Sequence, residues 1–100
     1  MAKRRIYCDG AEMILFWDGR QHEETMSLKS NEIASIKFLK TTEKKFLFFS
    51  AESEKIEIKP SKLAYSITYS KSKAKEFFEQ YKEELAKFAK DNNVTFHNTL

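Results

Sequence analysis

The last third of the chain constrains the fold most, because an alternating segment runs directly into a helical one. Residues 63–70 place large side chains at every second position, which predicts a strand. Residues 71–90 carry apolar side chains at spacings of three and four, which predicts one long amphipathic helix. The apolar stripe of this helix consists of Ala74, Phe77, Phe78, Tyr81, Leu85, Phe88 and Ala89. Such a stripe must be buried, and we expect it to pack against a sheet.

Everything before this segment is typical of short strands. We expect strands at residues 5–8, 11–17, 20–28, 33–40, 46–49, 56–59 and 63–70, with polar turns at 41–45 and 52–55. Both glycines follow an aspartate, so Asp9-Gly10 and Asp18-Gly19 predict two-residue hairpin turns. The strand between them is apolar at consecutive positions, which predicts a central strand covered on both faces. Residues 91–100 either add a short edge strand or fray.

Composition and length indicate one soluble domain. The 100 residues suffice for a single core, which we expect within residues 5–90. A content of 33% charged and 41% hydrophobic residues is typical of a folded chain. The net charge of +3 is spread along the sequence and does not favour nucleic-acid binding. The lone Cys8 excludes an internal disulfide, and no apolar run is long enough to span a membrane, so we expect a cytoplasmic protein.

Seven strands in meander order followed by one helix resemble the pleckstrin-homology-like (PH-like) barrel, and in particular the small bacterial proteins built on it. The stretch from Met26 to Phe38, in which a polar strand turns into one containing Ile33-Ala34-Ser35-Ile36, is similar to the strand-turn-strand of those domains. The helix after residues 65–69 is similar in position to the one that caps the open end of the barrel. The resemblance implies an α+β, mainly β, fold: a seven-stranded antiparallel open barrel capped by the C-terminal helix.

The chain departs from that family in two places. Lipid-binding members carry basic residues around the first hairpin loop, whereas this loop is the tight and acidic Asp9-Gly10-Ala11-Glu12. The resemblance therefore does not imply phosphoinositide binding at that loop. Many family helices also carry a tryptophan, but the only tryptophan here, Trp17, is on an expected strand.

The sequence offers no set of residues typical of catalysis or metal binding. His22 and His97 are far apart, and no His-x-x-x-His or Cys-x-x-Cys spacing accompanies them. Cys8 lies in an expected strand, where we interpret it as a small core residue and not as a nucleophile. The adjacent glutamates at 23–24 and 83–84 point in different directions and are expected to be solvated. We therefore expect a protein that is not an enzyme and that uses no cofactor or metal.

One local cluster suggests a binding site. Lys71, Lys73 and Lys75 crowd the first turn of the predicted helix, where the macrodipole favours acids and each cation costs about 0.3–1 kcal/mol. With Ser70 and Ser72 as capping candidates, the cluster would bind a phosphate, a carboxylate or an acidic peptide. The alternative is that the three lysines are simply exposed and screened by salt.

Two further groups have simpler interpretations. Lys3, Arg4 and Arg5 are expected to form a mobile, solubilising terminus. Tyr65 and Tyr69 are expected to face inward, which disfavours a surface for single-stranded nucleic acid.

These observations predict a non-enzymatic module that recognises another protein, or its own copy, through a sheet edge. An open barrel leaves edge strands, and residues 20–28 and 93–100 are expected to be more available than 56–59, which charges and Pro60 protect. The competing function is binding of an anion or a lipid headgroup at the lysine-rich helix start. Headgroup binding would depend strongly on salt, which separates the two hypotheses.

Overall fold

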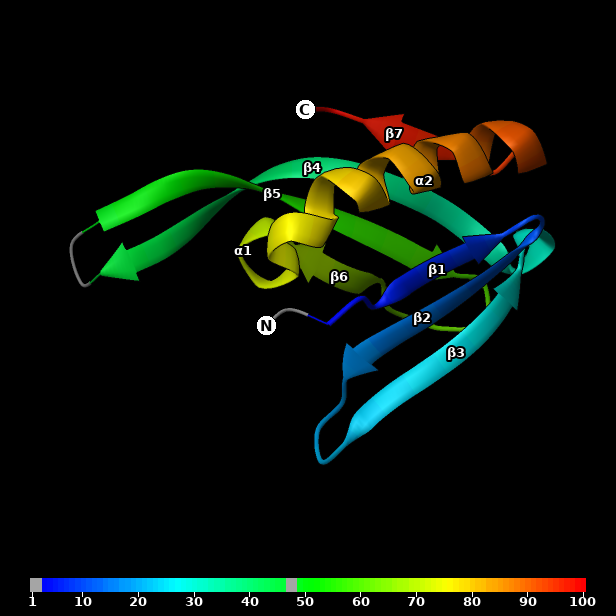
Figure 1. Ribbon diagram of the computed structural model, residues 1–100, viewed down its shortest axis with the longest axis horizontal. Helices are drawn as coiled ribbons and strands as arrows, with labels where there is room; N and C mark the ends of the chain where they lie inside the picture. The colour runs from blue at the N-terminus through cyan, green and yellow to red at the C-terminus, as the bar shows by residue number, and fades with distance from the viewer. Residues whose placement is uncertain (1–2, 47–48) are drawn as a thin grey trace.

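The computed structural model describes residues 3–46 and 49–100, with side chains for all of these except residues 43–50. The described chain forms seven strands in two sheets and a broken C-terminal helix, which confirms the predicted α+β class (Figure 1). Sheet A contains β1 (Ile6–Asp9), β2 (Glu12–Asp18) and β3 (Glu23–Lys29) in that order. Sheet B has the order β6-β5-β4-β7, with β4 (Ile33–Phe46), β5 (Phe49–Pro60), β6 (Ile67–Ser70) and β7 (Phe96–Asn98).

Short helical segments connect and cover these sheets. The 3-10 turn η1 (Ser30–Glu32) leads from sheet A to sheet B. The C-terminal helix consists of α1 (Lys71–Ala74), the 3-10 turn η2 (Lys75–Phe77) and α2 (Phe78–Asn92). In Figure 1, α2 crosses sheet B and has β1 along its other side, and it contacts both β1 and β4. Its buried residues are Phe78, Tyr81, Leu85, Phe88 and Ala89, which confirms most of the predicted stripe.

Alternation places one face of each sheet in a shared core. On β2, Met13 and Leu15 are fully buried, whereas Ile14 between them is 40% exposed. The expectation that both faces of this strand are covered is therefore wrong. Tyr7 on β1, the cross-strand partner of Ile14, is exposed as well. The outer face of sheet A thus meets solvent, because α2 and sheet B cover only its inner face.

A bulge explains how β4 buries two isoleucines at a spacing of three. In a regular strand, residues three apart point to opposite faces. The β4–β5 register shifts between Ile33 and Ser35, so one extra residue is accommodated there. Ile33 and Ile36 consequently both reach the core.

The predicted turns at 41–45 and 52–55 are wrong, because β4 and β5 continue through them as one long antiparallel hairpin. The expected strands 46–49 and 56–59 are not separate elements, and residues 47–48 of the first lie outside the described residues. Each strand of the hairpin supplies backbone partners for the other, so a polar sequence does not end the pairing.

The strand count before the helix is also corrected. Six described strands precede the helix, and the seventh is β7, formed by the tail, so the tail adds an edge strand instead of fraying. Because β7 runs parallel to β4, the predicted fully antiparallel arrangement is wrong at this pair. The two sheets do not close into a barrel.

The two Asp-Gly sites differ in conformation. Gly10 has φ +61 and is the first of the two loop residues between Asp9 and Glu12, the position where a type II′ turn needs glycine. The first hairpin is thus confirmed, but its loop is Gly10-Ala11 and lies one residue later than predicted. The predicted second two-residue turn is wrong, because β2 ends at Asp18 and β3 begins at Glu23. Gly19 is needed there for space, since a Cβ atom would lie 2.7 Å from the carbonyl oxygen of His22.

Candidate functional site

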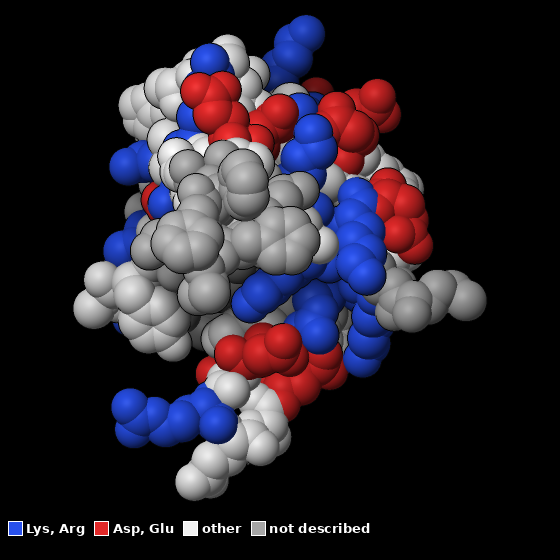
Figure 2. Space-filling view, turned by 90° about the vertical axis from the view of Figure 1, so that its left-hand side faces the viewer, with Lys and Arg blue, Asp and Glu red and all other residues white. Residues whose placement is uncertain are grey.

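Four of the five residues of the predicted anion site, Ser70, Ser72, Lys73 and Lys75, lie along a groove of about 640 Å³. The groove runs between the N-terminal arm (residues 3–5), the segment that leads into β6, and the helix start. Its basic residues are Lys3, Arg5, Lys73 and Lys75. Its hydroxyl groups come from Tyr65, Ser66, Thr68, Tyr69, Ser70, Ser72 and Tyr81. Figure 2, viewed from the left-hand side of Figure 1, shows Lys and Arg side chains gathered to the right of the centre, with acidic side chains below them.

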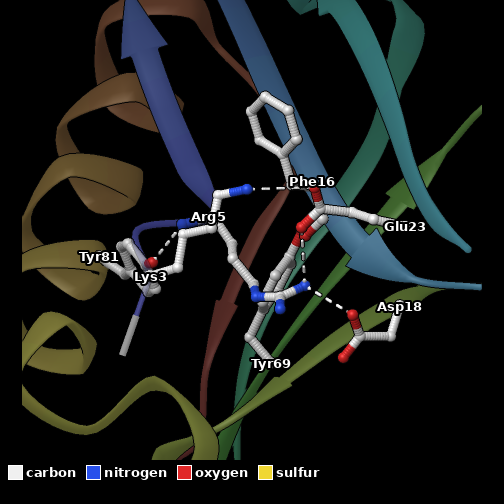
Figure 3. A network of polar contacts seen from close by, with 7 residues as sticks. All are labelled: Lys3, Arg5, Phe16, Asp18, Glu23, Tyr69 and Tyr81. Carbon is white, nitrogen blue, oxygen red and sulfur yellow. Dashed lines mark hydrogen bonds and ion pairs between the residues drawn. The ribbon is translucent and has the colours of Figure 1, made fainter. Parts of the chain in front are cut away.

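A polar network ties the N-terminal arm to both layers of the fold (Figure 3). The backbone N–H of Arg5 donates to the hydroxyl of Tyr81 at 2.6 Å. The hydroxyl of Tyr69 on β6 donates to the carbonyl of Phe16 on β2 at 2.8 Å, which joins the two sheets. Burial raises the pKa of both tyrosines, so these hydroxyls remain neutral. The arm is therefore part of the packed structure, and the expectation of a mobile terminus at residues 3–5 is wrong.

Carboxylates already neutralise the two cations of the arm that line the groove, Lys3 and Arg5. The guanidinium of Arg5 lies 3.1 Å from Asp18 and 3.4 Å from Glu23, and the ammonium of Lys3 lies 3.2 Å from Glu23. By contrast, Lys73 and Lys75 are exposed and have no ion pair with any described residue. The positive charge available in the groove therefore comes from the helix start.

The predicted site residues do not form a single arrangement. Ser70 and Ser72 lie with their hydroxyl oxygens 3.4 Å apart, and Ser70 precedes α1 without a side-chain capping hydrogen bond. Lys71 does not line the groove, and its ammonium lies 3.8 Å from Glu54 on β5. The structure thus places Ser70, Ser72, Lys73 and Lys75 around the groove and Lys71 outside it.

Because the helix is broken, the lysines at residues 71–75 do not oppose the macrodipole of a long helix, contrary to what the sequence indicated. The predicted single helix over 71–90 is wrong, because Lys75 has φ 52 and ψ −121 and separates α1 from the longer α2. The long helix begins at Phe78 and carries Glu79 in its first turn and Lys90 in its last. These charges suit its macrodipole, whereas Lys71 and Lys73 lie in a one-turn helix with little dipole of its own.

The second candidate site is the set of open sheet edges. Within the described residues, β1 and β3 flank sheet A, and β6 and β7 flank sheet B. The expected availability of residues 20–28 and 93–100 agrees with the edge positions of β3 and β7. Residues 56–59 lie on β5, which has neighbours on both sides, so the lower availability expected there agrees as well.

The longest open edge belongs to the β4–β5 hairpin. β7 pairs with β4 only at residues 36–38, and β6 pairs with β5 only at residues 55–58. Among the residues that the structure describes, residues 39–46 and 49–54, which we call the ribbon, therefore pair only with each other. Figure 1 shows the ribbon extending away from the rest of the molecule.

The hydrogen-bond pattern of β2 shows which backbone N–H and C=O groups of β3 point away from sheet A. Phe16 donates its N–H to the carbonyl of Arg5, so the backbone groups of Phe16 face β1 and those of its neighbour Leu15 face β3. Leu15 pairs with Met26, and the groups of Met26 consequently face β2. The backbone groups of Glu23, Thr25, Ser27 and Lys29 therefore point away from sheet A.

The remaining candidate residues do not assemble into a reactive site. His22 lies in the loop before β3 and His97 lies on β7. Burial and the nearby Glu84 raise the pKa of Cys8 to about 11, which makes its thiol a poor nucleophile. No group of three or more His, Cys, Asp or Glu side chains suited to a metal occurs in the described part of the chain. None of its helices has the length and apolar character needed to cross a membrane.

Sequence reasoning missed parts of both candidate sites. Tyr65 was expected inside but is 54% exposed on the groove, because β6 begins only at Ile67. Tyr69 is buried as expected. The glutamates expected to be solvated include Glu84, which binds Arg4 at 2.6 Å, and Glu23, which holds the arm. Three successive cations at residues 3–5 could have indicated that the arm forms ion pairs. The sequence does not identify the partners, because they lie up to 80 positions away.

Comparison with protein-family models, with curated proteins and with solved structures found no match to this chain.

Proposed function

We propose that this protein is a non-enzymatic interaction module of the PH-like type, which associates with a second copy or with another protein by pairing strands at an open sheet edge. The proposal rests on the open edges of the two sheets. A meander of six strands in two sheets, followed by a helix that packs on them, supports the PH-like assignment.

The unpaired outer edges of the ribbon are the main support for this function. An isolated two-stranded hairpin is only marginally stable in water, and its unpaired backbone groups accept further strands readily. Residues 39–46 and 49–54 form such a two-stranded hairpin, with no described strand paired to either outer edge. The outer edge of β3 adds a second row of free groups. Strand addition provides affinity through main-chain hydrogen bonds and needs no ligand pocket or catalytic group.

The test is the solution mass of the protein, measured by light scattering over a range of concentrations at low and high salt. Three variants accompany the native chain: one with residues 43–51 replaced by Asn-Gly, one that ends at residue 94, and Thr25→Pro. They shorten the ribbon, remove β7 and remove an outward N–H of β3, respectively. Thermal unfolding of each variant shows whether it is folded, and the ribbon variant keeps all the residues of sheet B whose side chains the structure describes as buried.

A mass above that of the monomer, lost in one folded variant and kept in the other two, supports the function and identifies the edge. Strand pairing changes little with salt, because backbone hydrogen bonds are not ionic contacts. A monomer at every concentration, combined with equal hydrogen exchange of the edge amides in dilute and concentrated protein, would argue against the function.

A second candidate function is binding of a phosphate or an acidic ligand in the groove. The observation that favours it is the pair of exposed lysines, Lys73 and Lys75, beside the hydroxyls of Ser70 and Ser72. Inorganic phosphate and an acidic peptide, titrated into native protein and into the variant with Lys71, Lys73 and Lys75 changed to Gln, test this function. Equal affinity in both proteins, or binding that does not weaken with salt, refutes it.

A further inference from the structure

We propose that the partner is a second copy of this chain, which pairs through β3 in antiparallel orientation about a two-fold axis at Met26. This inference rests on the proposed function and names its edge, its partner and its register. The resulting dimer joins the two copies of sheet A into one continuous sheet.

The direction of the backbone groups selects the register. The outward-facing backbone groups of β3 belong to Glu23, Thr25, Ser27 and Lys29, because the intervening residues bond to β2. A two-fold axis at Met26 places Thr25 opposite Ser27 of the other copy and Glu23 opposite Lys29. Every outward residue of β3 then faces another outward residue. Axes at Thr25 or Ser27 leave part of this row without a partner.

The side chains agree with the same register. Glu23 begins the strand and Lys29 ends it, so each carboxylate faces an ammonium of the other copy. Opposite charges at facing positions stabilise a strand pair. The end near Glu23 also carries Asp18 and Glu24, and these three carboxylates are matched in number by the cations of Lys3 and Arg5 in the arm and of Arg20 in the β2–β3 loop.

The side chains in the middle of the proposed interface, on the outer face of β3, are small and polar. Thr25 and Ser27 are exposed, and no bulky side chain of β3 blocks the approach of another strand there. One outward group is already used, because the N–H of Lys29 donates to the carboxylate of Glu32 at 2.9 Å. The η1 turn thus closes this end of the edge and limits the pairing to the length of β3.

Charge variants test the dimer without disturbing the monomer. The acidic variant carries Thr25→Glu and Ser27→Glu, and the basic variant carries Thr25→Lys and Ser27→Lys. Each variant alone places like charges opposite one another, and we expect its Kd for self-association to rise by about tenfold or more. A mixture of the two places opposite charges at the same positions, and we expect a dimer of one acidic and one basic chain. Circular dichroism confirms that each variant is folded.

A cysteine at the axis tests the register directly. In the background Cys8→Ala, the variant Met26→Cys places two thiols at a non-hydrogen-bonded pair, where Cα atoms lie about 4.5 Å apart, within the range of a disulfide. The matched control Ser27→Cys places them about 8 Å apart, beyond that range. Mild oxidation should link the chains of the first variant and not those of the second.

The outcomes separate this inference from the proposed function. A mixed dimer together with crosslinking at residue 26 alone supports it. Failure of the charge variants to form a mixed dimer, or equal crosslinking at 26 and 27, overturns it. If the native protein is a dimer that is lost on shortening the ribbon or removing β7, the β3 dimer is refuted and the proposed function stands. If the native chain is monomeric up to millimolar concentration with equal amide exchange, both are refuted.

Discussion

The change Lys75→Gly tests the most consequential difference between the sequence and the structure, because the two predict effects of opposite sign. Lys75 has φ 52, a conformation that costs a residue with a side chain about 1–2 kcal/mol and costs glycine almost nothing. Glycine also loses more freedom on folding, which offsets about 0.5–1 kcal/mol of that gain. We therefore expect the free energy of unfolding to rise by about 0.5–1 kcal/mol.

The matched control is Lys73→Gly, which removes the same exposed charge from a residue inside α1. At that position glycine should lower the free energy of unfolding by about 0.5–1 kcal/mol. Denaturant titration measures both values. Each kilocalorie should also shift the Tm by about 4–8 °C in a domain of this size. If Lys75→Gly destabilises the protein as much as Lys73→Gly does, the helix is continuous through residue 75 and the reasoning is refuted.

Three further predictions concern the core. Phe78→Ala should lower the free energy of unfolding by about 3–5 kcal/mol, because Phe78 is fully buried. Phe77→Ala should lower it by clearly less, because Phe77 is only partly buried. Equal losses for the two variants in denaturant titrations would contradict this prediction. Tyr69→Phe should cost about 1–3 kcal/mol in the same assay, because the carbonyl of Phe16 loses its donor, and an unchanged stability would show that water replaces the hydroxyl. The raised pKa of Cys8, about 11 against an ordinary 9.0, predicts that a thiol reagent reacts about a hundredfold more slowly with native than with unfolded protein at pH 8. The same shift predicts that the contribution of Cys8 to the stability is constant below about pH 9 and falls as the pH rises from 9 to 11, because the unfolded thiol ionises first. Identical pH profiles of stability for the native chain and for Cys8→Ala would contradict it.

The open β3 edge raises the question of how the chain avoids uncontrolled association. Natural edge strands are commonly protected by charged residues, short length or irregular ends. Here Glu23 and Lys29 lie at the two ends of β3, and the η1 turn closes one of them. In the proposed dimer these same features permit one register and disfavour others. The edge would thus be satisfied by a single closed pairing and not by an open array.

The ribbon raises the same question for sheet B. Residues 39–46 and 49–54 have no strand beside them in the described chain, so an isolated monomer leaves these backbone groups to water. Such groups exchange rapidly in an isolated ribbon and slowly when a strand covers them. Hydrogen exchange of these amides therefore separates a role in association from a purely structural one.

Local sequence determined the elements whose signals involve only near neighbours. The stripe from Phe78 to Ala89 predicted α2, since its spacing permits one buried face in any environment. Asp9-Gly10 predicted the first hairpin, because glycine reaches a positive φ at little cost. The alternation around Ile56 and Ile58 predicted the core face of β5.

Tertiary structure decided what depends on distant partners. Polar residues at 41–45 and 52–55 form strands because each supplies the backbone partner of the other, a relation that no local window contains. The helix breaks at Lys75, although the local sequence has no glycine or proline that would predict a break there. The arm is ordered because Tyr81, Asp18 and Glu23 meet it in space. The sequence by itself therefore determined the α+β class and the buried faces of α2 and of β5 around Ile56 and Ile58, since these follow from periodicity. Only the tertiary structure decided which edges stay open and which charges meet, because both depend on contacts between residues far apart in the chain.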